Sequence, residues 1–296
     1  MDDATYATVD GVRLRYDVRG SGEPVVLIHW GVSARWAEPL LGEPALARFQ
    51  LLKYDRAGFG DSRAPRSPVR MADHAEHCKL LMDRLELECA HVVGHSSSAV
   101  VALQLALDHP ERVRSLALFE PARPALPTET QTAFVRNTVQ PAVERYRDGD
   151  TPGAVDTWAR GVFGPDYREP LERGLPGAVE QCIADAPAFF EQELPALQDW
   201  SFTEAEAARV TQPVLLFLGT SSVPTFAERI ELLLSWLPSG ERHDVPGATH
   251  LLHIQDPRGL AEPLAAFFAR HPIADLQRRP AYGSTSAESV GSGSVG

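Results

Sequence analysis

The segment from Ala90 to Pro110 contains a serine at a sharp change of local structure. It begins as a short apolar run and continues as a helical pattern with apolar residues on most faces, which Pro110 ends. Between the two lies the sequence Gly-His-Ser-Ser-Ser, residues 94–98. A strand that turns sharply into a helix strains the residue at the turn and needs small neighbours two positions away. Such a turn presents a serine hydroxyl for nucleophilic chemistry.

Of the three serines, Ser96 alone has small residues two positions away on both sides, Gly94 before it and Ser98 after it. For Ser97 the residue two positions earlier is His95, which is too bulky for the turn. We therefore predict Ser96 as the nucleophile, with the backbone N–H of Ser97 at a helix N-terminus facing a developing anion. The alternative is an ordinary strand–turn–helix with polar residues at its N-cap.

The elements around this turn alternate between strand and helix, which indicates a mainly parallel sheet covered by helices. The carboxyl ends of such strands form the site in open α/β sheets. A hairpin with its turn at residues 10–11 fits residues 9–18. Further strands are expected at residues 25–29, 50–54, 90–93, 115–119, 214–218 and 241–245, and helices at residues 71–87, 226–236 and 259–269.

Residues 123–212 differ in character, since prolines interrupt helical stretches that are dense in aromatic residues. We interpret them as a helical cap inserted into a core domain of residues 1–122 and 213–272. Most of the cap aromatics should pack on one another, but some should face a substrate pocket, because small-molecule sites are mostly apolar. The pocket candidates are Trp30, Trp158, Phe189 and Phe190. The polar, Gly/Ser-rich tail, residues 273–296, is expected to be disordered.

A serine hydroxyl is a weak nucleophile at neutral pH, so it needs a base within hydrogen-bond reach and an anion that orients the base. His250 lies in a glycine-containing loop after the last expected strand, and it is the candidate base. His95 is expected to pack within the turn, and His29 to hydrogen-bond backbone at the end of its strand. His253 lacks the Pro-Gly-x-x-His setting of His250.

Five motifs, spread from about Val9 to Phe268, resemble those of the α/β-hydrolase superfamily and follow its order. They are L-I-H-W-G, Y-D-R-A-G-F-G-D-S, G-H-S-S-S, F-L-G-T-S-S and P-G-A-T-H. The resemblance implies an α/β-hydrolase fold, with a mainly parallel eight-stranded sheet, helices on both faces and an inserted helical cap. It also implies the chain order nucleophile, acid, histidine, with His250 as the base.

The acid departs from the usual superfamily pattern. In most members an aspartate lies three residues beyond the strand that here ends at Gly219, and this chain has Ser222 there. Glu120 ends the strand after the elbow helix, and its longer side chain could reach the same imidazole from there. The sequence Phe-Glu-Pro and the missing later aspartate resemble the subgroup of zearalenone-type lactone hydrolases, which takes its acid from this strand.

The resemblance thus implies a catalytic triad of Ser96, His250 and Glu120. In the alternative, Glu120 is a capping or loop carboxylate and the acid is Asp55, Asp244 or absent. Asp55 ranks second, because an aspartate at this position of D-x-x-G-x-G-x-S loops often has a structural role.

The oxyanion hole needs two N–H donors directed at the tetrahedral oxygen. Ser97 supplies one, and by position in the motif after the first parallel strand Gly31 supplies the other. Trp30 stands where relatives often have glycine, and it either forms a pocket wall or packs on the cap. Ser98 replaces the second glycine of the elbow and should fit with modest adjustment.

Composition excludes several other classes of protein. The 296 residues carry a net charge of −12, which argues against nucleic acid and anionic membranes as partners. The three scattered cysteines have no metal-binding spacing and suit a reducing compartment, and no signal peptide or membrane-length apolar run is seen. We therefore expect a cytoplasmic protein without cofactor or metal, either monomer or homodimer.

The reaction expected from these residues is hydrolysis of an ester or lactone bond in an apolar small molecule. A C–C bond hydrolase, a perhydrolase or an amidase would use the same triad. A protein of another class, a non-catalytic ligand-binding relative of these hydrolases, is the remaining alternative, since Trp30, Ser98 and Ser222 are departures that a decaying site would show.

Overall fold

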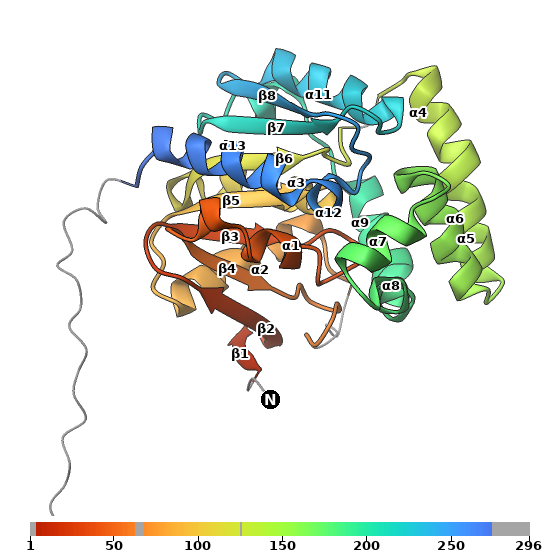
Figure 1. Cartoon of the computed structure of the whole chain (residues 1–296), viewed down its shortest axis with the longest axis horizontal. Coiled ribbons are helices and arrows are strands. Elements are labelled where there is room, and N and C mark those ends of the chain that lie inside the picture. The colour runs from red at the N-terminus through yellow and green to blue at the C-terminus, as the bar shows by residue number, and fades with distance from the viewer. Residues whose placement is uncertain (1–3, 63–67, 125, 274–296) are drawn as a thin grey trace, which may run out of the picture.

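The structure, a computed structural model, describes residues 4–62, 68–124 and 126–273. Its centre is one sheet with strand order β1-β2-β4-β3-β5-β6-β7-β8 (Figure 1). β1 and β2 form an antiparallel hairpin, β2 is antiparallel to β4, and the remaining neighbours pair in parallel. From β1 to β8 the strands are Thr5–Val9, Val12–Arg19, Pro24–Ile28, Gln50–Tyr54, Ala90–His95, Val113–Phe119, Val214–Gly219 and Gly240–Val245.

The parallel register brings the functional candidates to one edge of the sheet. β3, β5 and β7 are buried at every residue, as expected for strands covered on both faces. His95 at the end of β5 lies opposite Phe119 at the end of β6. The next residues along the chain, Ser96 and Glu120, therefore leave neighbouring carboxyl ends of the sheet, where ligands bind in open α/β folds.

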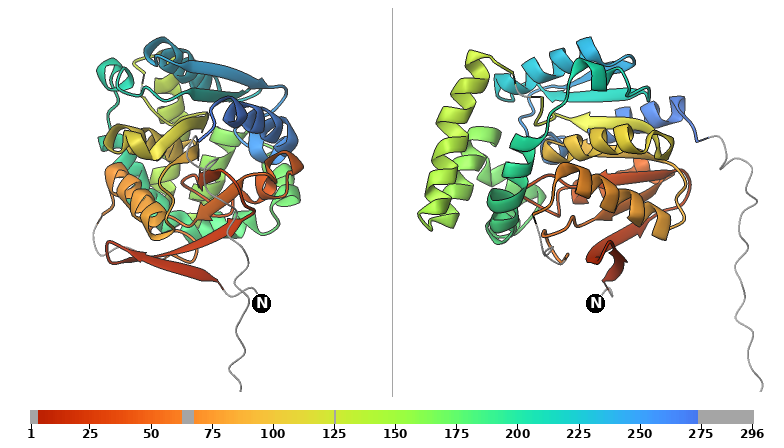
Figure 2. Two further views of the ribbon diagram at one scale, coloured as in Figure 1. Left: turned by 90° about the vertical axis from the view of Figure 1, so that its left-hand side faces the viewer. Right: turned by 180° about the vertical axis from the view of Figure 1, so that it is seen from behind.

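Helices cover both faces of the sheet. α2 packs with α3 on one face and α1 packs with α13 on the other, as the front and back views show (Figures 1 and 2). α11 packs against β7 and β8. These helices, with two short ones, are α1 (Glu38–Leu41), α2 (Met71–Arg84), α3 (Ser97–Asp108), α10 (Glu204–Ala207), α11 (Pro224–Trp236), α12 (Leu252–Gln255) and α13 (Pro257–Arg270), and 3₁₀ turns span Pro44–Leu46 and Pro110–Arg112.

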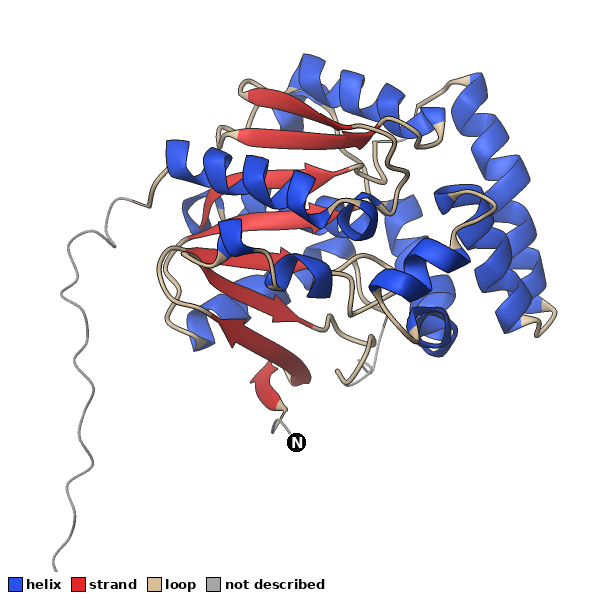
Figure 3. Cartoon of the chain, in the orientation of Figure 1, coloured by secondary structure: helices blue, strands red, loops and turns tan. Residues whose placement is uncertain are grey.

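Between β6 and β7 the chain forms a separate cluster of helices beyond the carboxyl ends of the strands (Figure 3). We call this cluster the cap. It consists of α4 (Glu129–Phe134), α5 (Gln140–Arg147), α6 (Thr151–Phe163), α7 (Arg168–Gly174), α8 (Ala178–Pro187) and α9 (Leu194–Asp199), with π-helical segments η3 (Val135–Val139) and η4 (Ala188–Glu193). Its aromatic side chains pack together, as Trp158 and Phe189 do with ring centroids 4.8 Å apart.

The predicted fold class, including the eight-stranded, mainly parallel sheet with helices on both sides, is confirmed. The domain limits at residues 123 and 212 stay a prediction. Ile273, the first residue of the predicted tail, is buried, and its N–H donates to Glu23 at 3.2 Å. Residues 274–296 of that tail lie outside the described residues. Within the described ranges, no helix is long and apolar enough to cross a membrane.

Candidate active site

Ser96 occupies the turn between β5 and α3 in a strained backbone conformation, with φ 56° and ψ −114°. Its N–H donates to Phe119 O at 2.8 Å, which ties the turn to the end of β6. Gly94 is required here, because a Cβ at this position would lie 2.5 Å from Ser98 O and 2.8 Å from Ala99 N. Backbone strain of this kind is typical of functional sites and holds a side chain in a fixed, outward position.

Ser98, which replaces the usual glycine of the elbow, is fully buried and fits through two hydrogen bonds. Its hydroxyl donates to Ile28 O of β3 at 2.6 Å and accepts the N–H of His95 at 2.8 Å. The hydroxyl therefore links β3 to the turn at Ser96. A glycine at position 98 could not make this link. The departure from the glycine pattern is compatible with an intact turn.

His250 is fully buried and is oriented by Glu120. Its Nδ1 lies 2.5 Å from Glu120 Oε2, and Glu120 Oε1 accepts the N–H of Gly219 at 2.8 Å. Both carboxylate oxygens are thus engaged, and Nδ1 carries the proton that it donates to Glu120. Among the described residues, Nε2 of His250 has no hydrogen-bond partner. This arrangement leaves Nε2 free to accept a proton, which is the orientation of the histidine that a serine nucleophile needs.

The surroundings of His250 are largely aromatic. Its ring stacks on Phe226 with centroids 4.1 Å apart, and Trp30 and His95 also lie against it. Burial lowers the pKa of His250, the bond to Glu120 opposes this, and the nearby charge of Arg229 adds to the lowering. The imidazole is therefore neutral at neutral pH and ready to accept a proton.

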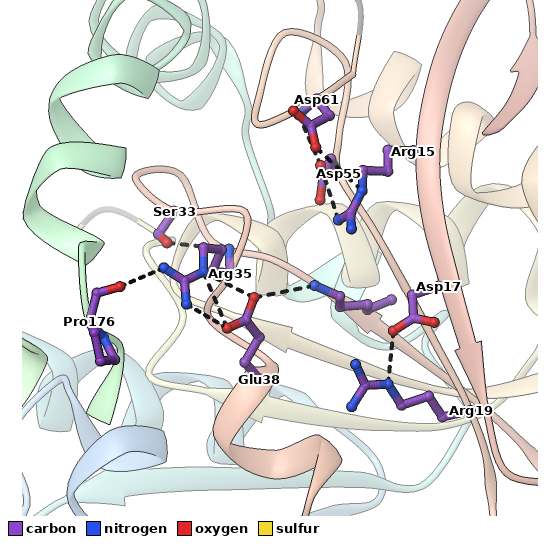
Figure 4. Close-up of polar contacts among 10 residues, drawn as sticks. Arg15, Asp17, Arg19, Ser33, Arg35, Glu38, Asp55, Asp61 and Pro176 are labelled. Carbon is purple, nitrogen blue, oxygen red and sulfur yellow. Dashed lines mark hydrogen bonds and ion pairs between the residues drawn. The ribbon is translucent and has the colours of Figure 1, made fainter. Parts of the chain in front are cut away.

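The other acid candidates have different partners. Asp55 Oδ2 accepts the N–H of Asp61 at 3.0 Å and lies 3.9 Å from Arg15, as Figure 4 shows. Burial raises the pKa of Asp55 to about 6. Asp244 pairs with Arg242 near the surface. Of the three carboxylates considered from the sequence, the structure brings only Glu120 to His250.

A cavity of about 140 Å³ lies between the cap and the sheet. Ser96, Ser97, Gly31 and His250 all line it, so the predicted nucleophile, base and oxyanion donors face one space. Its aromatic walls include Trp30, Phe134, Trp158, Phe163, Phe189 and Phe226. The mostly apolar lining, with a few convergent polar groups, is that of a small-molecule site.

Three of the four predicted pocket residues line this cavity: Trp30, Trp158 and Phe189. Phe190 does not. It lines a smaller apolar cavity within the cap and stacks on Tyr146 with centroids 4.7 Å apart. Phe189 lines both cavities, whereas Phe190, which points in a different direction from the same helical segment, lines only the smaller one.

The loop that carries Gly31 is held by several bonds. His29 accepts the N–H of Arg56 at Nε2 and contacts Trp30 O through Nδ1 at 2.6 Å, as expected from its place at the end of β3. Arg35 donates to Pro176 O of the cap at 2.7 Å and pairs with Glu38 (Figure 4). The loop that carries Gly31 is therefore anchored both to the sheet and to the cap.

Sequence reasoning missed four residues that line the cavity: Phe226 and Arg229 of α11, Gln131 of α4 in the cap, and Arg123, which follows β6. The helical spacing of residues 226–236 gave no sign that the first turns of this helix form a pocket wall. A charged residue on the buried side of a helix, Arg229, was the available signal.

A strained serine, a histidine oriented by a carboxylate and an apolar cavity on this sheet define a hydrolase-type site. Residues 23–257 match the alpha/beta hydrolase fold family, and the chain belongs to that family.

Individual relatives cover parts of the chain. The acetyltransferase component of an acetoin cleaving system from Cupriavidus necator is 39% identical over 39% of this chain and 31% of its own length. A 2-hydroxymuconate semialdehyde hydrolase from Pseudomonas is 38% identical over 40% of this chain and 43% of its own length. The matched segments thus span less than half of these relatives. An enol-lactonase from Burkholderia xenovorans has a similar fold, with TM-score 0.72 and 22% identity over 90% of this chain and all of its own.

Proposed function

We propose that the protein is a cofactor-independent serine hydrolase that cleaves an ester or lactone bond of an apolar small molecule. The observation that carries the proposal is the 2.5 Å contact between His250 Nδ1 and Glu120 Oε2. His250 lines the same cavity as Ser96. This contact holds the imidazole in the tautomer whose Nε2 can accept a proton.

In the proposed reaction, Ser96 Oγ attacks the carbonyl carbon while its proton passes to Nε2 of His250. The N–H groups of Gly31 and Ser97 stabilise the tetrahedral oxyanion. When the intermediate collapses, the C–O bond to the leaving group breaks and His250 gives its proton to the alkoxide. Water then attacks the acyl carbon and gives a proton to His250. As the C–O bond to Ser96 breaks, His250 passes this proton to Ser96 Oγ and the acid product leaves. In a lactone, acid and alcohol remain in one molecule.

Glu120 is the proposed acid of this triad. Its position after β6 supports the resemblance to zearalenone-type lactone hydrolases that the sequence suggested. The carboxylate stabilises the imidazolium that forms twice in each turnover. The scattered cysteines, of which Cys78 and Cys182 are buried free thiols, support a reducing compartment such as the cytoplasm.

The first test is labelling with a fluorophosphonate, which reacts with activated serines. We expect labelling of the unmodified protein and none of Ser96→Ala. Glu120→Gln should lower kcat by about 10⁴-fold by analogy with triad acids, with the fold intact by circular dichroism. Asp244→Asn is the control carboxylate variant and should retain activity. Normal turnover by Glu120→Gln would contradict the proposed acid.

The second candidate function is C–C bond hydrolysis with the same triad, favoured by the match to a 2-hydroxymuconate semialdehyde hydrolase. Mass spectrometry on macrolactones, aryl esters and β-diketones distinguishes the two. A single product heavier by one water indicates a lactonase, whereas two fragments indicate an esterase or a C–C hydrolase according to the bond broken. A protein that neither labels nor turns over any of these would instead be a ligand-binding relative.

A further inference from the structure

Two arginines line the cavity that contains Ser96 and His250. Arg229, from α11, is only 3% exposed, and Arg123, which follows β6, is half-buried. In the part of the chain that the structure describes, neither forms an ion pair with a carboxylate. A buried guanidinium without a counter-charge is unfavourable, so its retention in a cavity points to a ligand that supplies the charge.

The contacts of Arg229 leave part of its fork free. Nη2 donates to Gln131 Oε1 at 2.5 Å, and the same oxygen accepts the hydroxyl of Thr225 at 2.8 Å. Nε of Arg229 has no hydrogen-bond partner among the described residues. Gln131 belongs to α4 of the cap, beside the end of α11 (Figure 1). The amide thus fixes the guanidinium but does not neutralise it.

Two carboxylates, Glu228 and Glu120, act on the charge of Arg229 through space, but neither is bonded to it. Glu120 uses one oxygen for His250 and the other for the N–H of Gly219. Glu228, the neighbour of Arg229 on α11, accepts the hydroxyl of Thr128 at 2.8 Å. Burial lowers the pKa of Arg229 to about 10, which still leaves the side chain charged at neutral pH.

The remaining walls of the cavity are mainly aromatic and aliphatic. Such walls suit a neutral apolar ester, but they do not account for two arginines. Arg123 donates from Nε to Leu197 O at 2.8 Å, and its charge lies near enough to Arg229 to lower the pKa of that side chain. Guanidinium groups bind carboxylates and phosphates through paired, charge-assisted hydrogen bonds, and a carboxylate is the smaller and less highly charged of the two.

We propose that Arg229, with Arg123, forms an anion subsite that binds a carboxylate of the substrate. The substrate is then an amphiphile with an apolar body and one carboxylate, and it carries this group in addition to the bond that is cleaved. That the ligand is a substrate rests on the proposed hydrolase function. Binding of a carboxylate by the subsite does not depend on turnover.

Equilibrium binding tests the subsite without catalysis. In the Ser96→Ala protein, 6-phenylhexanoate and the neutral 6-phenylhexanamide differ only in charge. We expect the carboxylate to bind roughly tenfold or more tightly than the amide, and Arg229→Gln to reduce that ratio to near one. Arg229→Lys should keep part of the ratio, and exchange of an exposed arginine of α2, Arg84→Gln, should keep all of it. Circular dichroism checks that each variant is folded.

Equal binding of the two compounds by the parent protein, including no binding of either, would overturn the subsite. So would a ratio that Arg229→Gln leaves unchanged. If Arg229→Gln does not fold, Arg123→Gln and Arg229→Lys provide the comparison, and the ratio must fall in both.

Kinetics separate this proposal from the proposed function. The two substrates are 4-nitrophenyl hydrogen glutarate, an anionic half-ester, and 4-nitrophenyl pentanoate, its neutral counterpart. Faster Ser96-dependent hydrolysis of the half-ester supports both proposals. Equal hydrolysis of the two esters contradicts the subsite and leaves the hydrolase, whereas selective carboxylate binding with no hydrolysis of either contradicts the hydrolase and leaves the subsite.

Discussion

The guanidinium of Arg56 and the carboxylate of Glu193 lie 2.6 Å apart, and neither side chain is exposed to solvent. The two groups form an ion pair, but the N–H groups of Arg56 are not directed at the carboxylate oxygens of Glu193 as in a hydrogen bond. Arg56 follows β4 in the core, whereas Glu193 ends η4 of the cap. Arg56 also donates from Nε to His29 O at 3.0 Å. One buried cation therefore joins the cap to the loop that carries the proposed oxyanion donor.

Removal of one partner should destabilise the fold strongly. Glu193→Leu leaves the guanidinium buried without a counter-charge, and we expect the free energy of unfolding in urea to fall by about 3–5 kcal/mol. The double variant Arg56→Met/Glu193→Leu should regain much of that loss, because no charge remains to be compensated. Glu262→Gln, which breaks the exposed pair with Arg258, is the control and should not move the midpoint. Equal stability of Glu193→Leu and the parent would contradict this role.

Gly31 has no room for a side chain. A Cβ there would collide with the carboxylate of Glu193 and lie 2.9 Å from Phe189 Cδ2. We expect Gly31→Ala to displace the loop that carries this residue and lower kcat/KM by up to about a hundredfold. Gly42→Ala serves as the control, since nothing lies within 4 Å of the place its added methyl group would take and its φ is −93°. Kinetics of both variants on one aryl ester give the comparison, and similar values for both would show that the loop tolerates the change.

The hydroxyl of Ser98 should contribute measurably to stability. Ser98→Ala leaves Ile28 O and the N–H of His95 without their present partner in a fully buried place. An unsatisfied buried polar group costs about 1–3 kcal/mol, so the urea midpoint should fall accordingly. Ser235→Ala, which removes an exposed hydroxyl, should leave it unchanged. A Ser98→Ala protein as stable as the parent would mean that the bridge contributes nothing.

The pH dependence of turnover should reflect the buried base. His250 must be neutral to accept the proton of Ser96, and burial lowers its pKa below the usual 6.5. The acid limb of kcat/KM should therefore have its midpoint below pH 6.5. A profile on a substrate without titratable groups measures it directly, and a midpoint above pH 6.5 would contradict the assignment.

Stability should also fall on acidification because of several buried histidines. Burial lowers the pKa of His29, His74 and His95 well below 6.5 and that of His253 to about 3. These rings stay neutral in the fold but bind protons in the unfolded chain below about pH 6.5, so acid favours unfolding. For each of these histidines, the free energy of unfolding should fall by an amount that approaches about 1.4 kcal/mol for every pH unit below the pKa of the unfolded chain. Urea titrations from pH 7.5 to 5 should show this slope, and constant stability would disprove it.

Much of the fold follows from local sequence patterns. The buried strands are short apolar runs, and the small residues around Ser96 are enough to locate the turn, since only one serine satisfies both steric conditions. The position of Glu120 at the end of the neighbouring strand follows from the order of the parallel strands. Its role and that of His250 stay predictions, but the structure brings the two side chains into contact.

The pocket could be predicted only in part. Its walls depend on how α4 and α11 meet, and no local pattern encodes the packing of segments about a hundred residues apart. For this reason the helical spacing of residues 226–236 did not single out Arg229, although its side chain is buried and donates to Gln131 of the cap. The same limitation explains Phe190, since the directions of Phe189 and Phe190 depend on a π-helical segment that the sequence does not reveal.

The contact between Glu120 and His250 also matters for how such chains are recognised in genomes. A search pattern that demands an aspartate three residues after β7 finds Ser222 in this sequence and classes the protein as a pseudoenzyme. A pattern that accepts a carboxylate after either β6 or β7 would retain it. Inventories of inactive paralogues in this family should therefore be re-examined for a glutamate directly after β6.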